Sequence, residues 1–598
     1  MTRRARRRPP GRGRLPGRQS FRHAAEAEAD HHRLVRLRST VLLFILAAAM
    51  LGLAAQLISL HVVHASALEA MAERQQAGRL TIAPARGRLL DRSGRPLAIN
   101  VEAQSVYAVP SKIPNRHAFA RAVAPVLRLP PAEVASRLPS NLQFAWLARK
   151  VTPEVAAALR ARAPGDQLGF LPEARRVYPN GPLAAHLLGF AGIDNQGLAG
   201  AELAFDGHLR GRAGLARVER DAIGRPRFET RDILREPTDG ADVVLTIDQV
   251  IQHIAERELD SALAATRARW GAVLIMEPKS GDLLAMATAP RFDPNAFARA
   301  KPVEWVNRAL GTIVEPGSTF KIVLAAAALE GGVVDPHEVF VSTGELKVGG
   351  GHVIREAHNR RFPRQTLGDI VRNSSNVGAA MVATRLGKER FYDAIRRFGF
   401  GRPTGIDLPG EAPGLIPPPS QWLGSGLQTI GFGQGISATP LQVLAAGAAI
   451  ANEGVVIRPR VLRAVRDAEG RALEVATPEI VGQATPRVVA RQVLAIMEDV
   501  VTRGTGTLAR IEGYRVAGKT GTAQKPGPDG RYLADTYIAS FLGIVPSDRP
   551  QLVILVMLDG PRGEYYGGAV AAPIFRTVAA QVLWHLRVPP SAVPEPAR

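Results

Sequence analysis

The feature that most limits how this chain can fold is an uncharged run near its N-terminus. Residues 40–63 contain no Asp, Glu, Lys or Arg. An apolar helix of about 20 residues is long enough to cross the hydrocarbon core of a bilayer. Arg33, Arg36 and Arg38 precede the run, and basic residues mark the side of a span that stays in the cytoplasm. We therefore expect a transmembrane anchor over residues 39–63, with the chain beyond it exported.

A cleaved signal peptide is the alternative, because Ala65-Ser-Ala67 resembles a peptidase site. The apolar core of a signal peptide is only about 7–15 residues long, which favours a retained anchor. Residues 1–38 are rich in Arg, Pro and Gly without an apolar period, so they are predicted to be a disordered basic cytoplasmic tail. Residues 587–598 are predicted to be a second disordered tail.

The exported part is too long for one hydrophobic core, since the chain has 598 residues. The polar stretch 234–242, which carries a proline and a glycine, is the predicted boundary. It separates a non-catalytic domain over residues 64–236 from a second domain over residues 237–586. In the second domain, predicted hairpins flank an Ala-rich helical block, which indicates an α+β fold with an antiparallel sheet.

Composition argues against several classes of function. The chain has no Cys, so disulfides, thiolate catalysis and Cys-type metal sites are excluded. No metal-ligand spacing stands out among the 13 His, and neither a metal nor a cofactor is expected. The net charge is +22, yet no basic stripe is interleaved with aromatics, so we expect no nucleic-acid partner.

The segment Glu315-Pro-Gly-Ser318-Thr-Phe-Lys321 carries the first chemical signal, because an apolar helical run follows it directly. Residues three apart on a helix face the same way, so the hydroxyl of Ser318 and the amine of Lys321 can touch. A neutral lysine can take the serine proton if burial or a second cation lowers its pKa. This motif alone is weak, since a helix-capping serine with a solvated lysine gives the same pattern.

Two downstream motifs strengthen it, namely Ser374-Ser-Asn376 and Lys519-Thr-Gly-Thr522. Their order after Ser-x-x-Lys is the constellation of penicillin-binding proteins and serine β-lactamases, with Ser in place of Asp in the middle motif. The chain thereby resembles a class B penicillin-binding protein of the division-specific (septal) type, the family of the penicillin-binding protein 3 type. Arg86-Gly87, Arg176 and Glu202 match the N-terminal module of that family, where such residues hold an elongated mixed pedestal together.

The resemblance implies a role for each matched residue, with the substrate held as an acyl group on the serine. Ser318 would be the nucleophile, Lys321 the general base, Ser374 the proton relay, and Asn376 the group that positions the donor amide. The backbone N–H groups of Ser318 and Thr522 would form the oxyanion hole. The terminal carboxylate of the substrate would bind Lys519, Thr520 and Thr522, and Gly521 would lie on the same substrate-binding strand.

The implied activity is a peptidoglycan D,D-transpeptidase that cross-links D-Ala-D-Ala stem peptides at the septum and is acylated by β-lactams. The implied location is the bacterial inner membrane, with a periplasmic catalytic domain. The implied partners are a multi-spanning glycosyltransferase and other division proteins. An elongation-specific relative is the first alternative, against which Ser-Ser-Asn and Tyr565-Tyr-Gly-Gly568 weigh. The others are a D,D-carboxypeptidase, a β-lactamase, and a non-enzyme that is either a β-lactam sensor or an inactive scaffold that keeps the motifs.

Overall fold

The computed structural model describes residues 19–591 apart from short gaps, and these residues fall into two compact units. One unit lies within Met1–Leu80 and Leu215–Leu234, and the other within Thr81–Gly214 and Arg235–Arg598. The gaps are residues 69–70, 72–76, 140–141, 143, 164, 221–225, 358–359, 528 and 530.

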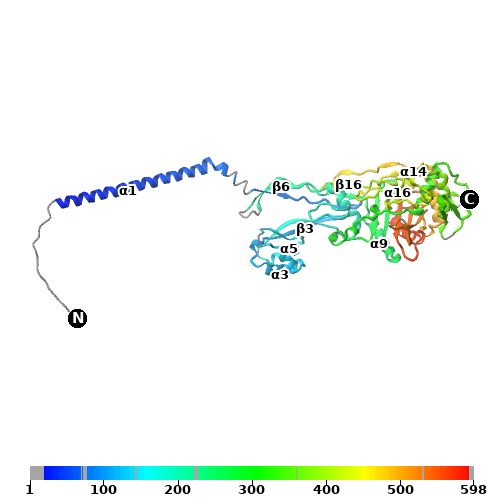
Figure 1. Ribbon diagram of the computed structural model, residues 1–598, viewed down its shortest axis with the longest axis horizontal. Helices are drawn as coiled ribbons and strands as arrows, with labels where there is room; N and C mark the ends of the chain where they lie inside the picture. The colour runs from blue at the N-terminus through cyan, green and yellow to red at the C-terminus, as the bar shows by residue number, and fades with distance from the viewer. Residues whose placement is uncertain are drawn as a thin grey trace, which may run out of the picture. The chain divides into compact units, whose positions relative to one another are not determined.

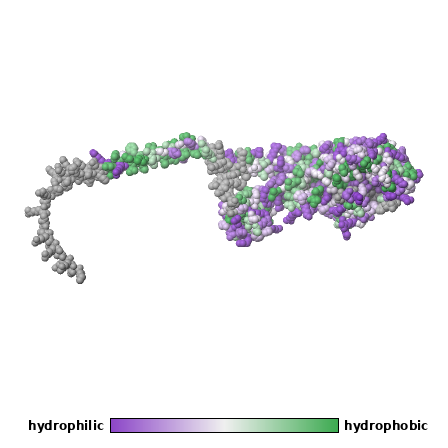
Figure 2. Space-filling model, viewed as in Figure 1, coloured by the Kyte–Doolittle hydropathy of each residue, from purple (hydrophilic) through white to green (hydrophobic). Residues whose placement is uncertain are grey.

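The first unit contains the long helix α1 (Gln19–Ile58), which ends in the π-helical turn η1 (Ser59–Val63) (Figure 1). The stretch Arg33–Val63, which runs from α1 into η1, is the one helical segment among the described residues that is long and apolar enough to cross a membrane. Its apolar side chains are exposed along the helix (Figure 2). This single N-terminal apolar helix is consistent with the predicted single-pass anchor. A three-stranded sheet in the order β1-β6-β7 is formed by β1 (Ala77–Ile82), β6 (Gly214–Arg220) and β7 (Pro226–Arg235).

The structure describes ordered residues inside both of the segments predicted to be tails. The helix α1 begins at Gln19, because prolines and glycines end at Gly17 and good helix formers follow; residues 1–18 lie outside the described residues. At the other end, Val588 is buried and the hydroxyl of Ser591 donates to Asp548 at 2.7 Å. The chain is therefore packed through Ser591, and residues 592–598 lie outside the described residues.

In the second unit, the N-terminal module is built on the long strand β3, which pairs antiparallel with both β4 and β5. Pairing of β3 with β5 runs from Ile99 opposite Val177 to Ala108 opposite Leu168. Helices α3, α4 and α5 bury a small separate core against these strands. The elements are β2 (Leu89–Leu90), β3 (Pro96–Ala108), β4 (Ala145–Val151), β5 (Leu168–Val177), α3 (Arg116–Leu127), α4 (Pro131–Ser136), α5 (Pro153–Arg160), α6 (Ala185–Leu188), α7 (Gly200–Ala204) and α8 (Asp206–Leu209).

Strand β8 (Asp242–Leu245) joins this module to the rest of the unit. It pairs in parallel with β2 and antiparallel with β16 (Leu462–Arg466), so one seven-stranded sheet contains strands from both predicted domains. The predicted limits of the two domains stay predictions.

A buried ion-pair cluster also stabilises the module. The carboxylate of Glu202, which is fully buried, accepts from the guanidinium groups of Arg86 at 2.7 Å and Arg176 at 2.6 Å, and from the Tyr178 hydroxyl at 3.1 Å. A charge taken out of water requires such partners. These contacts fit the structural role expected for Arg176 and Glu202.

The predicted second domain contains a five-stranded antiparallel sheet in the order β10-β9-β21-β20-β19. Alternate side chains of its strands enter two different cores, since Leu274 packs with α11 and α16 while Val273 packs with α9 and α19. Helical layers on both faces explain why the central strands are continuously apolar. The elements are β9 (Trp270–Met276), β10 (Leu283–Ala289), β19 (Ala517–Pro526), β20 (Tyr532–Val545), β21 (Leu552–Asp559), α9 (Gln249–Thr266), α11 (Lys321–Glu330), α16 (Pro440–Ala451) and α19 (Ala572–His585).

Further elements complete the α+β fold that the sequence predicted. The helices are α10 (Arg308–Gly311), α12 (Leu367–Arg372), α13 (Asn376–Leu386), α14 (Lys388–Arg397), α15 (Gly426–Ile430), α17 (Arg487–Thr502) and α18 (Gly567–Val570). The short strands are β11 (Phe340–Val341), β12 (Glu345–Lys347), β13 (Val353–Arg355), β14 (Arg364–Gln365), β15 (Val455–Ile457), β17 (Ala472–Val475) and β18 (Ile480–Gln483).

Candidate active site

Ser318 lies on the 3-10 turn η5 (Gly317–Phe320), which leads directly into α11. Gly317 has φ +55°, and its N–H donates to the carbonyl of Gly433 at 3.0 Å. A side chain at Gly317 would meet the Cβ of Ala523 on β19 at 2.9 Å, so glycine permits both the left-handed backbone and the close approach. The turn thereby places Ser318 between α11 and the edge strand β19.

Lys321 is 1% exposed, and four oxygens surround its amine. Its Nζ lies 2.9 Å from Ser318 Oγ, 2.8 Å from the carbonyl oxygen of Ser374, 3.3 Å from Ser374 Oγ and 2.8 Å from Asn376 Oδ1. The carbonyl and amide oxygens only accept hydrogen bonds. A neutral amine can donate its two N–H bonds to these two oxygens, which leaves its lone pair for the proton of Ser318. The geometry suits a general base.

Lys519 reaches the same cluster from β19 and is fully buried. Its Nζ donates to Ser374 Oγ at 2.9 Å and to the carbonyl oxygen of Thr520 at 3.0 Å. Ser374 has φ +58°, an uncommon backbone for a non-glycine residue, and its hydroxyl lies between the two amines. Five of the predicted residues therefore meet in one hydrogen-bonded network.

Burial lowers the pKa of both lysines. The pKa of Lys321 falls to about 7 because burial disfavours its charged form, and the negative charge of Glu356 acts in the opposite direction. The pKa of Lys519 falls well below its ordinary value, first through burial and then through the positive charge of Lys321. Two ammonium groups on one hydroxyl repel each other, so one of the two amines is readily neutral near pH 7.

The remaining predicted residues lie on β19, the edge strand of the sheet. The Thr520 hydroxyl contacts the Thr505 hydroxyl at 2.8 Å, and Thr522 Oγ1 accepts from the N–H of Gly567 at 3.1 Å. These contacts lie on the strand face opposite Lys519, because side chains alternate. Carboxylate binding by the two threonines stays a prediction, as does the oxyanion hole. Their hydroxyls are held in place, and each retains hydrogen-bonding capacity.

Gly521 faces the nucleophile turn. A Cβ there would lie 2.3 Å from Ser540 Oγ and 3.0 Å from Thr319 Cγ2. The chain's own side chains therefore pack against this glycine, and its place on a substrate-binding strand stays a prediction. Glycine at this position lets β19 approach η5 closely.

Sequence reasoning missed two carboxylates beside this cluster. Glu356 accepts from Ser375 and from backbone N–H groups at the start of α13. Glu315 accepts from the N–H of Gly435 at 2.8 Å and from the Tyr532 hydroxyl at 3.1 Å, which ties the segment before Ser318 to β20. The one available signal for Glu356 was the middle residue of Ser-Ser-Asn. It is a serine in this chain, whereas the Ser-Asp-Asn form has an acid at that position.

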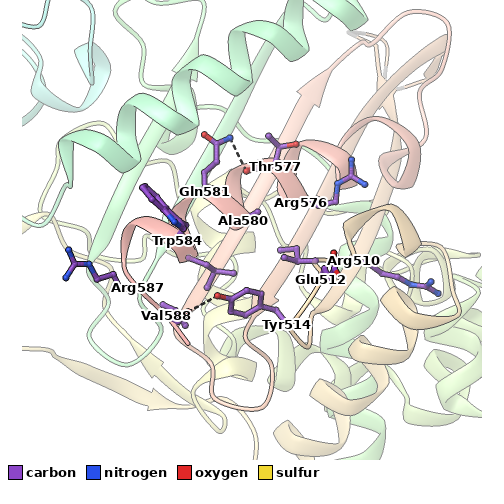
Figure 3. A pocket seen from close by; sticks show the side chains of 12 residues that line it. Arg510, Glu512, Tyr514, Arg576, Thr577, Ala580, Gln581, Trp584, Arg587 and Val588 are labelled. Carbon is purple, nitrogen blue, oxygen red and sulfur yellow. Dashed lines mark hydrogen bonds between the residues drawn. The ribbon is translucent and has the colours of Figure 1, made fainter. Parts of the chain in front are cut away.

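A pocket of about 880 Å³ lies elsewhere, between α19 and the segment that precedes β19 (Figure 3). In it the Tyr514 hydroxyl donates to the carbonyl of Val588 at 2.7 Å, and Trp584 is 83% exposed. None of the predicted site residues line this pocket, so we assign the chemistry to the Ser318 cluster. Among the described residues no group of three His, Asp or Glu could hold a metal ion.

Comparison with known proteins matches two domain families along the chain. Residues 271–580 match the penicillin-binding protein transpeptidase domain, and residues 81–245 match the penicillin-binding protein dimerisation domain. Stage V sporulation protein D of Bacillus subtilis is 37% identical over 88% of this chain and 82% of its own length. Peptidoglycan D,D-transpeptidase FtsI of Escherichia coli K12 is 34% identical over 86% of this chain and 85% of its own length.

Solved structures are similar over most of the chain as well. Penicillin-binding protein 3 of Mycobacterium tuberculosis in its apo form has a TM-score of 0.67 and 31% identity, covering 86% of this chain and 98% of its own. The same protein complexed with aztreonam gives 0.68 and 30%, with the same coverage.

The fold and the serine-lysine network thus define a penicillin-binding transpeptidase. The chain belongs to the class B penicillin-binding proteins, in which a dimerisation domain precedes the transpeptidase domain. The predicted family, the fold class and the serine-type acyl-transfer activity are confirmed.

Proposed function

We propose that this chain is a peptidoglycan D,D-transpeptidase that cross-links stem peptides during septum formation, with Ser318 as the acylated residue. The observation that carries the proposal is the position of Lys321 Nζ, 2.9 Å from Ser318 Oγ and held by two acceptor oxygens. The division role is supported by similarity to the peptidoglycan D,D-transpeptidase FtsI of Escherichia coli.

Acylation begins when neutral Lys321 takes the proton of Ser318. The Oγ attacks the carbonyl carbon between the last two D-Ala residues of the donor stem, and an ester bond forms as the C–N bond to the terminal D-Ala breaks. The leaving amine receives its proton from Ser374, which regains one from Lys321 across 3.3 Å. Lys321 returns to its neutral form. An amine of a neighbouring stem then attacks the ester, and the proton it loses returns through the same groups to Ser318.

Lys519 and Lys321 are coupled through substrate binding. The carboxylate of the terminal D-Ala beside Lys519 favours the charged form of that lysine. Because both amines contact Ser374, a charged Lys519 disfavours the charged form of Lys321. Substrate binding therefore prepares the general base for the reaction.

The test is a cross-linking assay on the full-length chain with a pentapeptide donor and a stem-peptide amine acceptor. We expect one new amide for each D-Ala released, and no product from Ser318→Ala. Ser136→Ala, on the exposed surface of α4, is the matched control. Release of D-Ala without amide formation would indicate a carboxypeptidase. A β-lactam adduct that turns over in seconds would indicate a β-lactamase.

Two cellular features belong to the same proposal. The N-terminus is cytoplasmic and the catalytic domain periplasmic, supported by the arginines that precede the apolar helix. Because the chain has no Cys, single variants such as Ser20→Cys and Ser136→Cys can be labelled with an impermeant maleimide in spheroplasts. We expect labelling at position 136 only, and the reverse pattern would contradict this orientation.

The proposed partners are a multi-spanning glycosyltransferase and other division proteins. Depletion of the chain from cells tests the division role. Filaments would support septum formation, whereas spheres or swollen cells would favour the elongation-specific alternative.

A further inference from the structure

Glu356 is a buried carboxylate directly behind the catalytic network. It follows β13, is 6% exposed, and forms no ion pair with Lys or Arg within the part of the chain that the structure describes. Its Oε2 accepts from the N–H of Asn376 at 2.8 Å, and its Oε1 accepts from the N–H of Val377 at 3.3 Å. The Ser375 hydroxyl donates to Oε1 at very short range. Both carboxylate oxygens therefore hold the start of α13.

The side chain of Ser375 also holds the start of α13 in place. Besides donating to Glu356, its Oγ accepts from the N–H of Gly378 at 2.9 Å and from Gln365 Nε2 at 3.1 Å. It is fully buried and points away from the lysines. Its two neighbours point the other way, since Ser374 and Asn376 both contact Lys321. The position that is acidic in the Ser-Asp-Asn form is thus a serine, and the acid comes from a different segment.

We propose that Glu356 is a positioning residue of the acyl-transfer site, which fixes Ser374 and Asn376 against Lys321 and supplies the negative charge of the buried cluster. The proposal rests on the function proposed for Ser318. Lys321 and Lys519 are two buried amines, and Glu356 is the carboxylate that, among the described residues, accepts from the backbone at the start of α13. The charged residues of the preceding helix α12 do not supply this charge, since Arg372 pairs with Asp369 at 2.6 Å and with Asp499 at 3.2 Å.

Glu356 acts on Lys321 in two ways that can be separated. Its hydrogen bonds orient Asn376, whose Oδ1 takes one of the two N–H bonds of the base. Its charge raises the pKa of Lys321, against the larger lowering by burial. The second cation facing Lys321, Lys519, has no part in holding α13. Removal of the Glu356 charge therefore changes the pH at which Lys321 becomes neutral.

The experiment measures the second-order rate constant of acylation by a fluorescent penicillin from pH 5 to 9 on the full-length chain. In Glu356→Gln, the amide has only one acceptor oxygen for the three donors that bind the carboxylate. Its NH2 group cannot accept from any of them. Loss of hydrogen bonds from a charged acceptor predicts a roughly 10- to 100-fold lower rate at pH 8. The rate falls as the pH is lowered, and the midpoint of this fall should move to lower pH. Without the charge of Glu356, Lys321 stays neutral at a lower pH.

Two further variants keep the test decisive. Ser375→Ala removes the hydroxyl while the carboxylate stays, so the rate should fall and the midpoint should stay in place. Glu356→Asp retains the charge on a shorter arm and should likewise keep the midpoint, which covers the case in which Glu356→Gln does not fold. An unchanged rate and midpoint in Glu356→Gln, or a midpoint shift in Glu356→Asp as well, would overturn the proposal. Loss of acylation in every variant and in the parent chain would instead refute the function proposed for Ser318.

Discussion

The pH dependence of acylation follows from the burial of Lys321. Its pKa is lowered from 10.5 to about 7, chiefly by burial. A lysine with the ordinary value would be neutral in roughly one molecule in 3,000 at pH 7, whereas the buried lysine is neutral in about half. Each pH unit below 7 then lowers the neutral fraction roughly tenfold, so about 1% remains neutral at pH 5.

The assay is the rate of acylation by a fluorescent penicillin between pH 5 and 9, measured on the full-length chain at subsaturating reagent. We expect a plateau above about pH 8 and a rate roughly 100-fold lower at pH 5. Lys321→Met should abolish the acid limb together with most of the rate. Lys279→Met changes an exposed lysine on the β9–β10 turn and is the matched control, with an unchanged profile.

The proposed chemistry determines whether the acylation rate rises or falls with pH. The base must be neutral, so activity rises with pH through the pKa of the folded enzyme. A rate that is flat from pH 5 to 8 would refute Lys321 as the base. A rate that still rises tenfold per unit at pH 9 would refute the lowering of its pKa.

Two further predictions concern packing. Glu202→Gln removes the carboxylate that buried Arg176 pairs with and leaves Arg86 with Asp206 alone, so it should lower the free energy of unfolding by about 3–5 kcal/mol. Chemical denaturation checks this, and acylation by penicillin at 25 °C should be unaffected; an unchanged denaturation midpoint would contradict the buried network. Gly521→Ala places a Cβ 2.3 Å from Ser540 Oγ and should slow acylation roughly 100-fold by displacing β19 from η5. Adding Ser540→Gly should restore part of the rate, and a Gly521→Ala enzyme as fast as the parent would show that the close approach is not required.

The part of the site formed by residues close together in the sequence could be predicted from the sequence. Ser318 and Lys321 are one helical turn apart, so their contact at 2.9 Å follows from local geometry. Ser374, Asn376 and Lys519 were found through the motifs they belong to, and the fold brings them together. Their chemical roles stay predictions until activity is measured.

Other features depend on long-range packing and leave little trace in sequence. Glu356 reaches the site through backbone N–H groups of α13, which no residue pattern encodes. The pairing of β8 with β2 and β16 unites the two predicted domains in one sheet, and a polar linker gave no hint of it. The helical start at Gln19 was missed because the high arginine content of the tail outweighed the local absence of proline and glycine.

The most direct test is mass spectrometry of the full-length chain after reaction with a labelled penicillin, with the adduct located by peptide mapping. We predict a single adduct on Ser318 that lasts minutes or longer and is absent from Ser318→Ala. An adduct on any other residue, or none at all under conditions where the chain is folded, would contradict the assignment of Ser318 as the acylated nucleophile.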